Sequence, residues 1–194
     1  MQTRLPFLLV GIWALAMVGA FWHFFHRDLG QFGSGDLSFF DGEQVSHSLG
    51  EQFRPSAAVG QVVHFWDRDC RCSRFNRQHA RDVMQQFGEQ GISFVVAVPS
   101  AAAQADARRL FPEASDVIVV RDAATVSSPA AAAFNAGGEL LYYGPYSDGV
   151  LCTSTEGSPV EQVLSDLLAD RQPRQWLNLS AVGCYCQWPA QTRT

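Results

Sequence analysis

Hydrophobic residues form one long uninterrupted run near the N-terminus and a series of short runs after it. The long run, Leu5 to Trp22, has 18 residues without a charge or a strongly polar group. As a helix rising 1.5 Å per residue, it would be roughly 27 Å long, about the thickness of a bilayer core. Arg4 precedes the run and Asp28 is the first acidic residue, which favours a cytoplasmic N-terminus. We therefore predict a membrane anchor over residues 1–27, with membrane contact through residues 5–25.

A cleaved signal peptide is the alternative for this segment. Val18-Gly19-Ala20 ends in a small residue, but it has Val two residues earlier, where a small residue is preferred, and the apolar run continues beyond it. We favour an uncleaved anchor. Either interpretation places the rest of the chain outside the cytoplasm, where disulfides are permitted.

The shorter runs predict a domain in which strands alternate with helices. Apolar segments predict strands over Gln61–Trp66, Ile92–Val98, Val117–Val120, Ala130–Phe134 and Glu139–Tyr143. Helical spacing of apolar residues predicts helices over Ser73–Phe87, Ala101–Phe111 and Pro159–Ala169. In the first of these helices, Phe75 is assigned to the buried face and His79 to the surface. The alternation, followed by a hairpin, indicates an α/β fold with a mixed sheet.

The remaining segments set the domain organisation. Glycine and serine are frequent after the anchor, which predicts a linker and docking segment over residues 28–57, with one short strand near Leu37–Phe40. The α/β domain is assigned to residues 58–171. A cysteine-containing tail follows at residues 172–194.

Composition and charge exclude several classes of function. Apolar residues make up 47% of the chain and charged residues 17%, which is typical of a folded protein. The formal net charge is -5, so the cationic face that nucleic-acid binding needs is not expected. All 14 basic residues are Arg, which excludes mechanisms that need a Schiff-base or Walker lysine. We expect no nucleic-acid partner and no cofactor, apart from a metal alternative described below.

Two cysteines stand at the junction of a buried strand and a helix. Cys70 and Cys72 follow the first predicted strand and precede the first predicted helix. The dipole and free N–H groups of a helix N-terminus stabilise thiolates and lower the pKa of a thiol. Asp67 and Asp69 oppose this effect, and nearby arginines strengthen it. We predict a reactive pair with Cys70 as the nucleophile; the alternative is buried packing or one inert disulfide.

The same region resembles the thioredoxin superfamily. Val62-Val-His-Phe-Trp-Asp-Arg-Asp-Cys-Arg-Cys72 is similar to the family's apolar strand, Phe-Trp pair and redox cysteine, and Ser127-Ser-Pro129 is similar to its cis-proline loop. The resemblance covers residues 58–171, and the layout is that of membrane-tethered, extracytoplasmic thiol–disulfide oxidoreductases. It implies a thioredoxin-like sandwich, attack by Cys70, and a cis Pro129 that packs beside it. The implied partners are protein thiols or disulfides.

Several positions differ from the thioredoxin pattern. The family has Cys-x-x-Cys, whereas here Ser73 holds the second position and Cys72 comes one residue earlier. His64 stands where thioredoxin has a buried acid. It is a candidate proton acceptor for the resolving thiol; the alternative is a half-buried strand histidine.

A second Cys-x-Cys pair, Cys184 and Cys186, lies in the aromatic tail, which we expect to pack back on the domain. Three uses stay open for it. It is a second redox pair that exchanges with Cys70 and Cys72, a structural disulfide within the pair or to Cys152, or part of a four-thiolate Cu or Zn site with Cys70 and Cys72. Because the chain has five cysteines, one thiol is expected to be free or intermolecular, and Cys152 is the candidate.

These observations lead to one function and its alternatives. We predict thiol–disulfide exchange through Cys70 and Cys72, relayed to Cys184 and Cys186. The predicted location is the bacterial inner membrane, with a single span and the main domain in the periplasm. The alternatives are a thiolate metal-binding module or metallochaperone, and a scaffold without catalysis.

Overall fold

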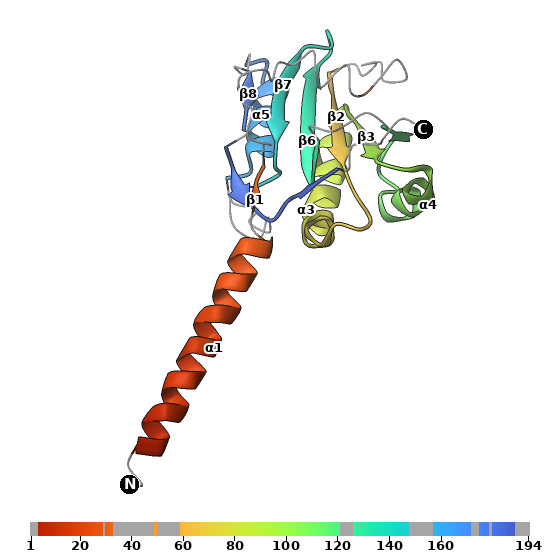
Figure 1. Cartoon of the computed structure of the whole chain (residues 1–194). Helices are drawn as coiled ribbons and strands as arrows, with labels where there is room; N and C mark the ends of the chain where they lie inside the picture. The colour runs from red at the N-terminus through yellow and green to blue at the C-terminus, as the bar shows by residue number, and fades with distance from the viewer. Residues whose placement is uncertain are drawn as a thin grey trace.

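The N-terminal helix α1, Arg4–Asp28, extends away from the rest of the molecule (Figure 1). The computed structural model describes residues 4–28, 30–32, 49, 59–120, 126–147, 157–171, 175–178 and 180–188. Within α1, residues Pro6–His23 are apolar enough to cross a membrane, and none of this window is buried against the domain. A signal sequence has the same length and composition, so the helix confirms an apolar N-terminal segment and leaves both interpretations of it standing.

The centre of the domain is a six-stranded mixed sheet in the order β4-β3-β2-β6-β7-β8. The strands β2, β3 and β4 are parallel, β6 is antiparallel to both β2 and β7, and β8 is parallel to β7. Their bounds are Gly60–Phe65 for β2, Ile92–Val98 for β3, Asp116–Val119 for β4, Ala130–Asn135 for β6, Leu140–Gly144 for β7 and Trp176–Leu177 for β8. The predicted mixed α/β fold and its hairpin are confirmed.

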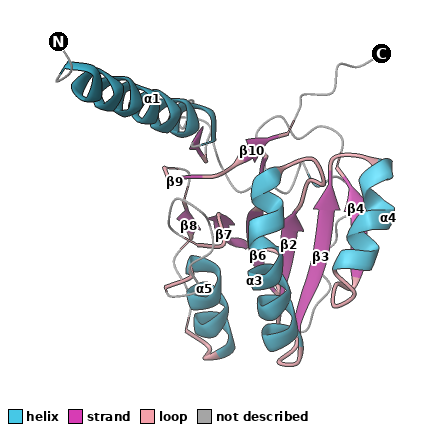
Figure 2. Cartoon of the chain, turned by 90° about the horizontal axis from the view of Figure 1, so that it is seen from below, coloured by secondary structure: helices cyan, strands magenta, loops and turns pink. Residues whose placement is uncertain are grey.

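Helices α3 (Arg71–Gly88), α4 (Ala101–Leu110) and α5 (Pro159–Leu168) cover the same face of the sheet (Figure 2). Side chains along β2 and the residue after it point alternately to the two faces of the sheet. Val62 and Trp66 therefore pack in the core under the helices, and Val63 and Phe65 pack in the core on the opposite face. The start of α5 is fixed by Ser158, whose Oγ accepts a hydrogen bond from the backbone N–H of Glu161. The three predicted helices are therefore confirmed.

The opposite face is covered in part by the two ends of the domain. Residue Phe32 and the tail residue Trp188 are buried there, and Tyr185 packs on Phe32 with ring centroids 5.1 Å apart. Two short antiparallel ladders hold the tail: β9 (Val182–Gly183) pairs with β1 (Gly30–Gln31), and β10 (Cys186–Gln187) pairs with β5 (Ser127–Ser128). The tail is therefore part of the folded domain.

Two sequence-based expectations lie outside the described residues, namely the strand near Leu37–Phe40 and the position of Cys152. The assignment of Phe75 to the buried face of α3 is wrong. Phe75 is 58% exposed, because the buried stripe of α3 runs through Asn76, Ala80, Val83 and Phe87. Phe75 is one position out of phase with that stripe, so its hydrophobicity misled the assignment.

Gly60 at the start of β2 provides a test of this packing. A Cβ atom there would lie 2.6 Å from Leu167 Cδ2 and 2.8 Å from the carbonyl oxygen of Phe134. Gly60→Ala is therefore expected to lower the free energy of unfolding by about 2 kcal/mol, measured by urea denaturation. Gly88→Ala is the matched control, since nothing lies within 4 Å of its added Cβ, and it should change stability by less than about 1 kcal/mol. Equal effects of the two substitutions would contradict the close approach at Gly60.

Candidate functional site

Cys70 and Cys72 lie at the carboxyl end of the central strand, where the chain turns into α3. The turn is closed by the backbone N–H of Cys70, which donates to the carbonyl of Asp67 at 3.3 Å, and by the N–H of Asp69, which donates to Asp67 Oδ1 at 3.0 Å. Cys70 is the N-cap residue of α3 with extended backbone angles, and its side chain makes no capping hydrogen bond. Cys72 is the second residue of the helix. The predicted position at a helix N-terminus is confirmed.

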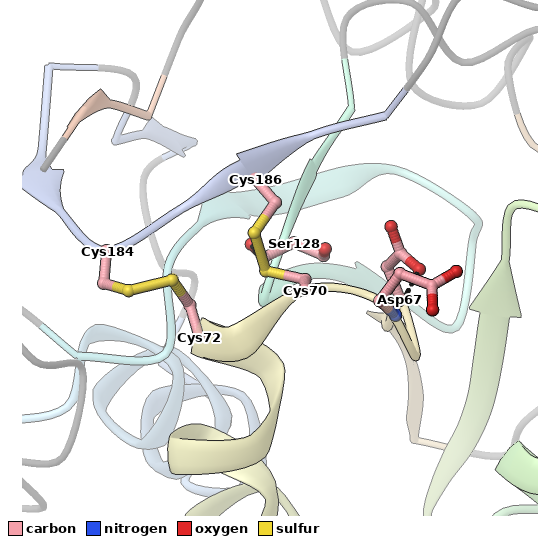
Figure 3. Close-up of a disulfide and its surroundings, with 7 residues drawn as sticks. Asp67, Cys70, Cys72, Ser128, Cys184 and Cys186 are labelled. Atoms are coloured by element: carbon pink, nitrogen blue, oxygen red, sulfur yellow. Dashed lines mark hydrogen bonds between the residues drawn. A yellow bond between two sulfur atoms is a disulfide. The ribbon is translucent and has the colours of Figure 1, made fainter. Parts of the chain in front are cut away.

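Both cysteines form disulfides with the tail (Figure 3). Cys70 is bonded to Cys186, with Cα atoms 5.8 Å apart, and Cys72 is bonded to Cys184, with Cα atoms 5.5 Å apart. Three other bonds were expected alternatives: one between Cys70 and Cys72, one within the tail pair, and one from the tail pair to Cys152. All three are wrong. The reason is that the tail runs across the start of α3, where each of its cysteines lies opposite one cysteine of the helix.

Backbone pairing places the tail over the helix N-terminus. Cys186 pairs with Ser128 in the β10–β5 ladder, and the N–H of Trp188 donates to the carbonyl of Val126 at 2.9 Å. The Ser128–Pro129 peptide bond is cis, as the resemblance implied. Cys70 Sγ lies 3.4 Å from the carbonyl oxygen of Ser128, which is a contact and not a hydrogen bond while the sulfur is in a disulfide. The β5 strand therefore contacts both the tail and Cys70, the residue that precedes α3.

The sulfur cluster is compact and largely buried. Cys70, Cys72 and Cys184 are at most 7% exposed, whereas Cys186 is partly exposed. The sulfur atoms of Cys70, Cys72 and Cys186 all lie within 4.8 Å of one another. A third sulfur is thus close to the Cys70–Cys186 bond, which is the arrangement that exchange between neighbouring disulfides needs.

The electrostatics of the helix N-terminus favour thiolates in the reduced site. The first turn of α3 contains no acidic residue, and the side chain of its N-cap residue, Cys70, makes no capping hydrogen bond. These N–H groups and the positive end of the helix dipole stabilise a negative charge on Cys70 or Cys72. Arg68, whose guanidinium binds Asp69 and Asp106, offsets part of the acidic charge in the preceding turn. Either cysteine of α3 is therefore a good leaving group when its disulfide is attacked.

His64 lies on β2 and faces the helices. Its ring packs edge-on against Phe111 and Tyr146, with centroids 5.0 and 5.1 Å away, and neither ring nitrogen has a hydrogen bond to a described residue. Burial lowers the pKa of His64 to about 3, and the backbone of Ala130 raises it by a smaller amount. Its role as a proton acceptor stays a prediction. A pKa this low disfavours that role, because the ring is then a weak base.

His79 is a correction to the sequence-based assignment. The residue is 5% exposed, and its Nε2 lies 2.8 Å from Oε1 of Glu161 on α5. His79 is four residues before Val83 and three after Asn76, which are both buried. This helical spacing, which places all three on one face, is the pattern from which its burial could have been predicted. The contact joins α3, which carries the two cysteines, to α5.

Taken together, these features describe an α/β domain with an N-terminal apolar helix and with a tail that is bonded by two disulfides to the helix after its central strand. The chain belongs to the family described as Domain of unknown function (DUF6436), whose profile matches residues 40–188. No functionally curated protein matches the chain.

Two solved structures share the fold with this chain. One is an uncharacterised conserved protein from Geobacillus kaustophilus, with a TM-score of 0.53 and 15% identity, covering 72% of this chain and 81% of its own. The other is a hypothetical protein from Sinorhizobium meliloti, with a TM-score of 0.51 and 11% identity, covering 76% of this chain and 85% of its own. At these identities the likeness concerns the fold alone.

Proposed function

We propose that this chain is a thioredoxin-like thiol–disulfide exchange protein, tethered to the bacterial inner membrane with its α/β domain in the periplasm. The observation that carries the proposal is the pairing of both cysteines at the start of α3 with the two cysteines of the tail. The parallel strands, the hairpin and the cis Pro129 beside Cys70 support a thioredoxin-like sandwich. The apolar α1 supports the tether.

The first step is attack on the more exposed disulfide. A substrate thiolate reaches Cys186, the cysteine of the four that is least buried, and forms a mixed disulfide with it. The electron pair of the broken bond goes to Cys70 Sγ, which leaves as a thiolate at the helix N-terminus. A second substrate thiolate then attacks the substrate sulfur of the mixed disulfide, and Cys186 leaves as a thiolate. Substrate leaves as a disulfide, and Cys70 and Cys186 remain as reduced thiols, so two electrons have entered the protein.

The second step moves the oxidising equivalent inside the protein. With both disulfides formed, the sulfur atoms of Cys70 and Cys186 already lie within 4.8 Å of Cys72 Sγ, which stays in its disulfide after the first step. Attack by either thiolate on Cys72 forms a new disulfide and releases Cys184 as a thiolate. This exchange conserves electrons, since one disulfide breaks as another forms. The tail pair is thus a relay partner of Cys70 and Cys72. Two more substrate thiols reduce the new disulfide in the same way, which completes a four-electron reduction of the protein.

Adduct mapping tests this order of events. The full chain in detergent micelles, free of metal, is mixed with limiting glutathione, quenched with acid and digested for mass spectrometry. We expect the first glutathione adduct on Cys186 and reversible titration of the Cys70–Cys186 bond at or above about -250 mV. Cys152→Ser is the control and should leave both results unchanged. In the Cys72→Ser/Cys184→Ser variant the first step should remain and the internal exchange should disappear.

Two results would contradict the proposal. One is a first adduct on Cys72 or Cys184, which would place the attack at the other disulfide. The other is a pair of disulfides that resist glutathione buffers down to about -300 mV, as structural disulfides of secreted proteins do.

A further inference from the structure

We propose that the reduced site binds one thiophilic d10 metal ion, of which Zn²⁺ is the test case, through Cys70, Cys72, Cys184 and Cys186. The proposal requires that the two disulfides can be reduced, and it does not require that they exchange with a substrate. It assigns to the site a second state in which a metal ion takes the place of the two disulfide bonds.

The sulfur geometry is the main argument. Three sulfur atoms, from Cys70, Cys72 and Cys186, lie within 4.8 Å of one another. In a tetrahedral thiolate site with Zn–S near 2.3 Å, sulfur atoms are roughly 3.8 Å apart. Reduction separates each bonded pair, and the third sulfur then has only about 1 Å to move. Cys184 lies outside this group of three, and its bond to Cys72 is what places it near the site, so we assign it as the fourth ligand with the longest distance to move.

The ligand set decides the class of metal. Among the described residues, this is the only group of three or more potential ligands whose donor atoms meet so closely, and every donor is sulfur. His64 does not join it in the described structure, because its ring packs between Phe111 and Tyr146. Thiolate donors without oxygen or imidazole favour Zn²⁺ or Cu⁺ over Mg²⁺, Ca²⁺ and Mn²⁺. Burial of three of the four cysteines fits a closed site without an open coordination position.

The surroundings favour the charge of such a site. Four thiolates and one Zn²⁺ carry two net negative charges, which the N–H groups in the first turn of α3 and the positive end of its dipole stabilise. Of the two acids in the preceding turn, Asp67 accepts a hydrogen bond from the N–H of Asp69, and the Asp69 carboxylate is paired with Arg68. Two antiparallel ladders, one directly before Cys184 and one that includes Cys186, hold the tail in addition to the disulfides.

The redox balance is simple. Reduction of the two disulfides takes four electrons and four protons, which two equivalents of a dithiol supply as each closes to a disulfide. The metal then binds the four sulfur atoms as thiolates, and their protons pass to solvent. Two equivalents of a substrate disulfide take the four electrons back, each becoming a dithiol, and the two protein disulfides re-form and release the ion. The site therefore binds metal only when reduced.

A zinc titration tests this state. The full chain in detergent micelles is reduced with a phosphine, freed of reductant without oxygen, and titrated with Zn²⁺ against a chromophoric chelator. We expect one Zn²⁺ per chain, none in the oxidised protein, and the charge-transfer and d–d bands of a tetrahedral thiolate site when Co²⁺ is used. Bound Zn²⁺ should also raise the melting temperature of the reduced protein.

Single substitutions identify the ligands. Cys70→Ser, Cys72→Ser and Cys186→Ser should each weaken Zn²⁺ binding at least 100-fold, and Cys184→Ser at least tenfold. Cys152→Ser is the matched control and should bind like the unsubstituted chain.

The outcomes separate this inference from the proposed exchange. Binding below one ion per chain, binding that survives oxidation, or loss of binding in Cys152→Ser would overturn the site. An unchanged affinity in Cys184→Ser would overturn the four-ligand assignment. Glutathione exchange measured in a chelating buffer reports on the proposed function alone, so exchange without zinc binding contradicts only the metal site. Zinc binding without exchange contradicts only the proposed function.

Discussion

Removal of both disulfides is expected to lower the free energy of unfolding by about 7 kcal/mol, whereas removal of either one costs only about 2 kcal/mol. The bonds close loops of 116 and 112 residues, one nested inside the other. In the chain-entropy account, the first bond over such a loop is worth about 5 kcal/mol. The second then closes only a ring of residues 70–72 and 184–186, worth about 2 kcal/mol. Each disulfide therefore largely substitutes for the other.

The test is a double-mutant cycle on the full chain. The variants Cys70→Ala/Cys186→Ala and Cys72→Ala/Cys184→Ala each remove one bond, and the quadruple variant removes both. Urea unfolding followed by near-ultraviolet circular dichroism gives the three changes in free energy. Cys152→Ala shows what loss of a cysteine outside the two bonds costs. If the costs of the two bonds simply add to the cost of losing both, the nested-loop argument fails.

Such redundancy suits an exchange protein. Opening one disulfide during a reaction cycle leaves the tail attached to α3 through the other bond. The ladders β10–β5 and β9–β1 and the buried Trp188 then have to hold the tail only when both bonds are open. The doubly reduced site is the state in which a bound metal ion would restore the lost cross-link.

The sequence predicted the core of the fold well because its elements are strongly patterned. The run Ile92–Val98 is a nearly continuous apolar strand, and β3 has these same bounds. A hairpin was predicted from the strands Ala130–Phe134 and Glu139–Tyr143, and β6 and β7 are antiparallel there, around a connection rich in Asn and Gly. In each case a local pattern of several residues specifies the element.

The connections of the site were not predictable in the same way. The spacing of Cys70 and Cys72 located the candidate site, but cysteine connectivity depends on tertiary structure and is not encoded by spacing. The tail is positioned by β9 and β10, strands of two residues each, which are too short to show any periodicity. Phe75 and His79 were assigned by residue type, and both assignments were wrong because helical phase decides burial.

His64 should make the domain sensitive to acid. Its pKa in the folded state is about 3, against about 6.5 when exposed, so below pH 6.5 the unfolded chain binds a proton that the folded chain does not. Stability is therefore lost as pH falls from about 6.5 towards 3, at up to about 1.4 kcal/mol per pH unit. Between pH 7 and pH 4 this single residue should cost about 3 kcal/mol.

His64→Leu removes the titrating group and leaves an apolar side chain of similar volume between Phe111 and Tyr146. Urea unfolding of both proteins at several pH values, in one detergent, measures the difference. The carboxylates that titrate in the same range are common to both proteins, so their effect cancels. We expect the substitution to change stability at pH 7 by less than about 1.5 kcal/mol and to flatten the acid limb of the curve. Parallel curves for the two proteins would show that His64 binds its proton over the same pH range in the folded and unfolded states, and would contradict its burial as a neutral ring.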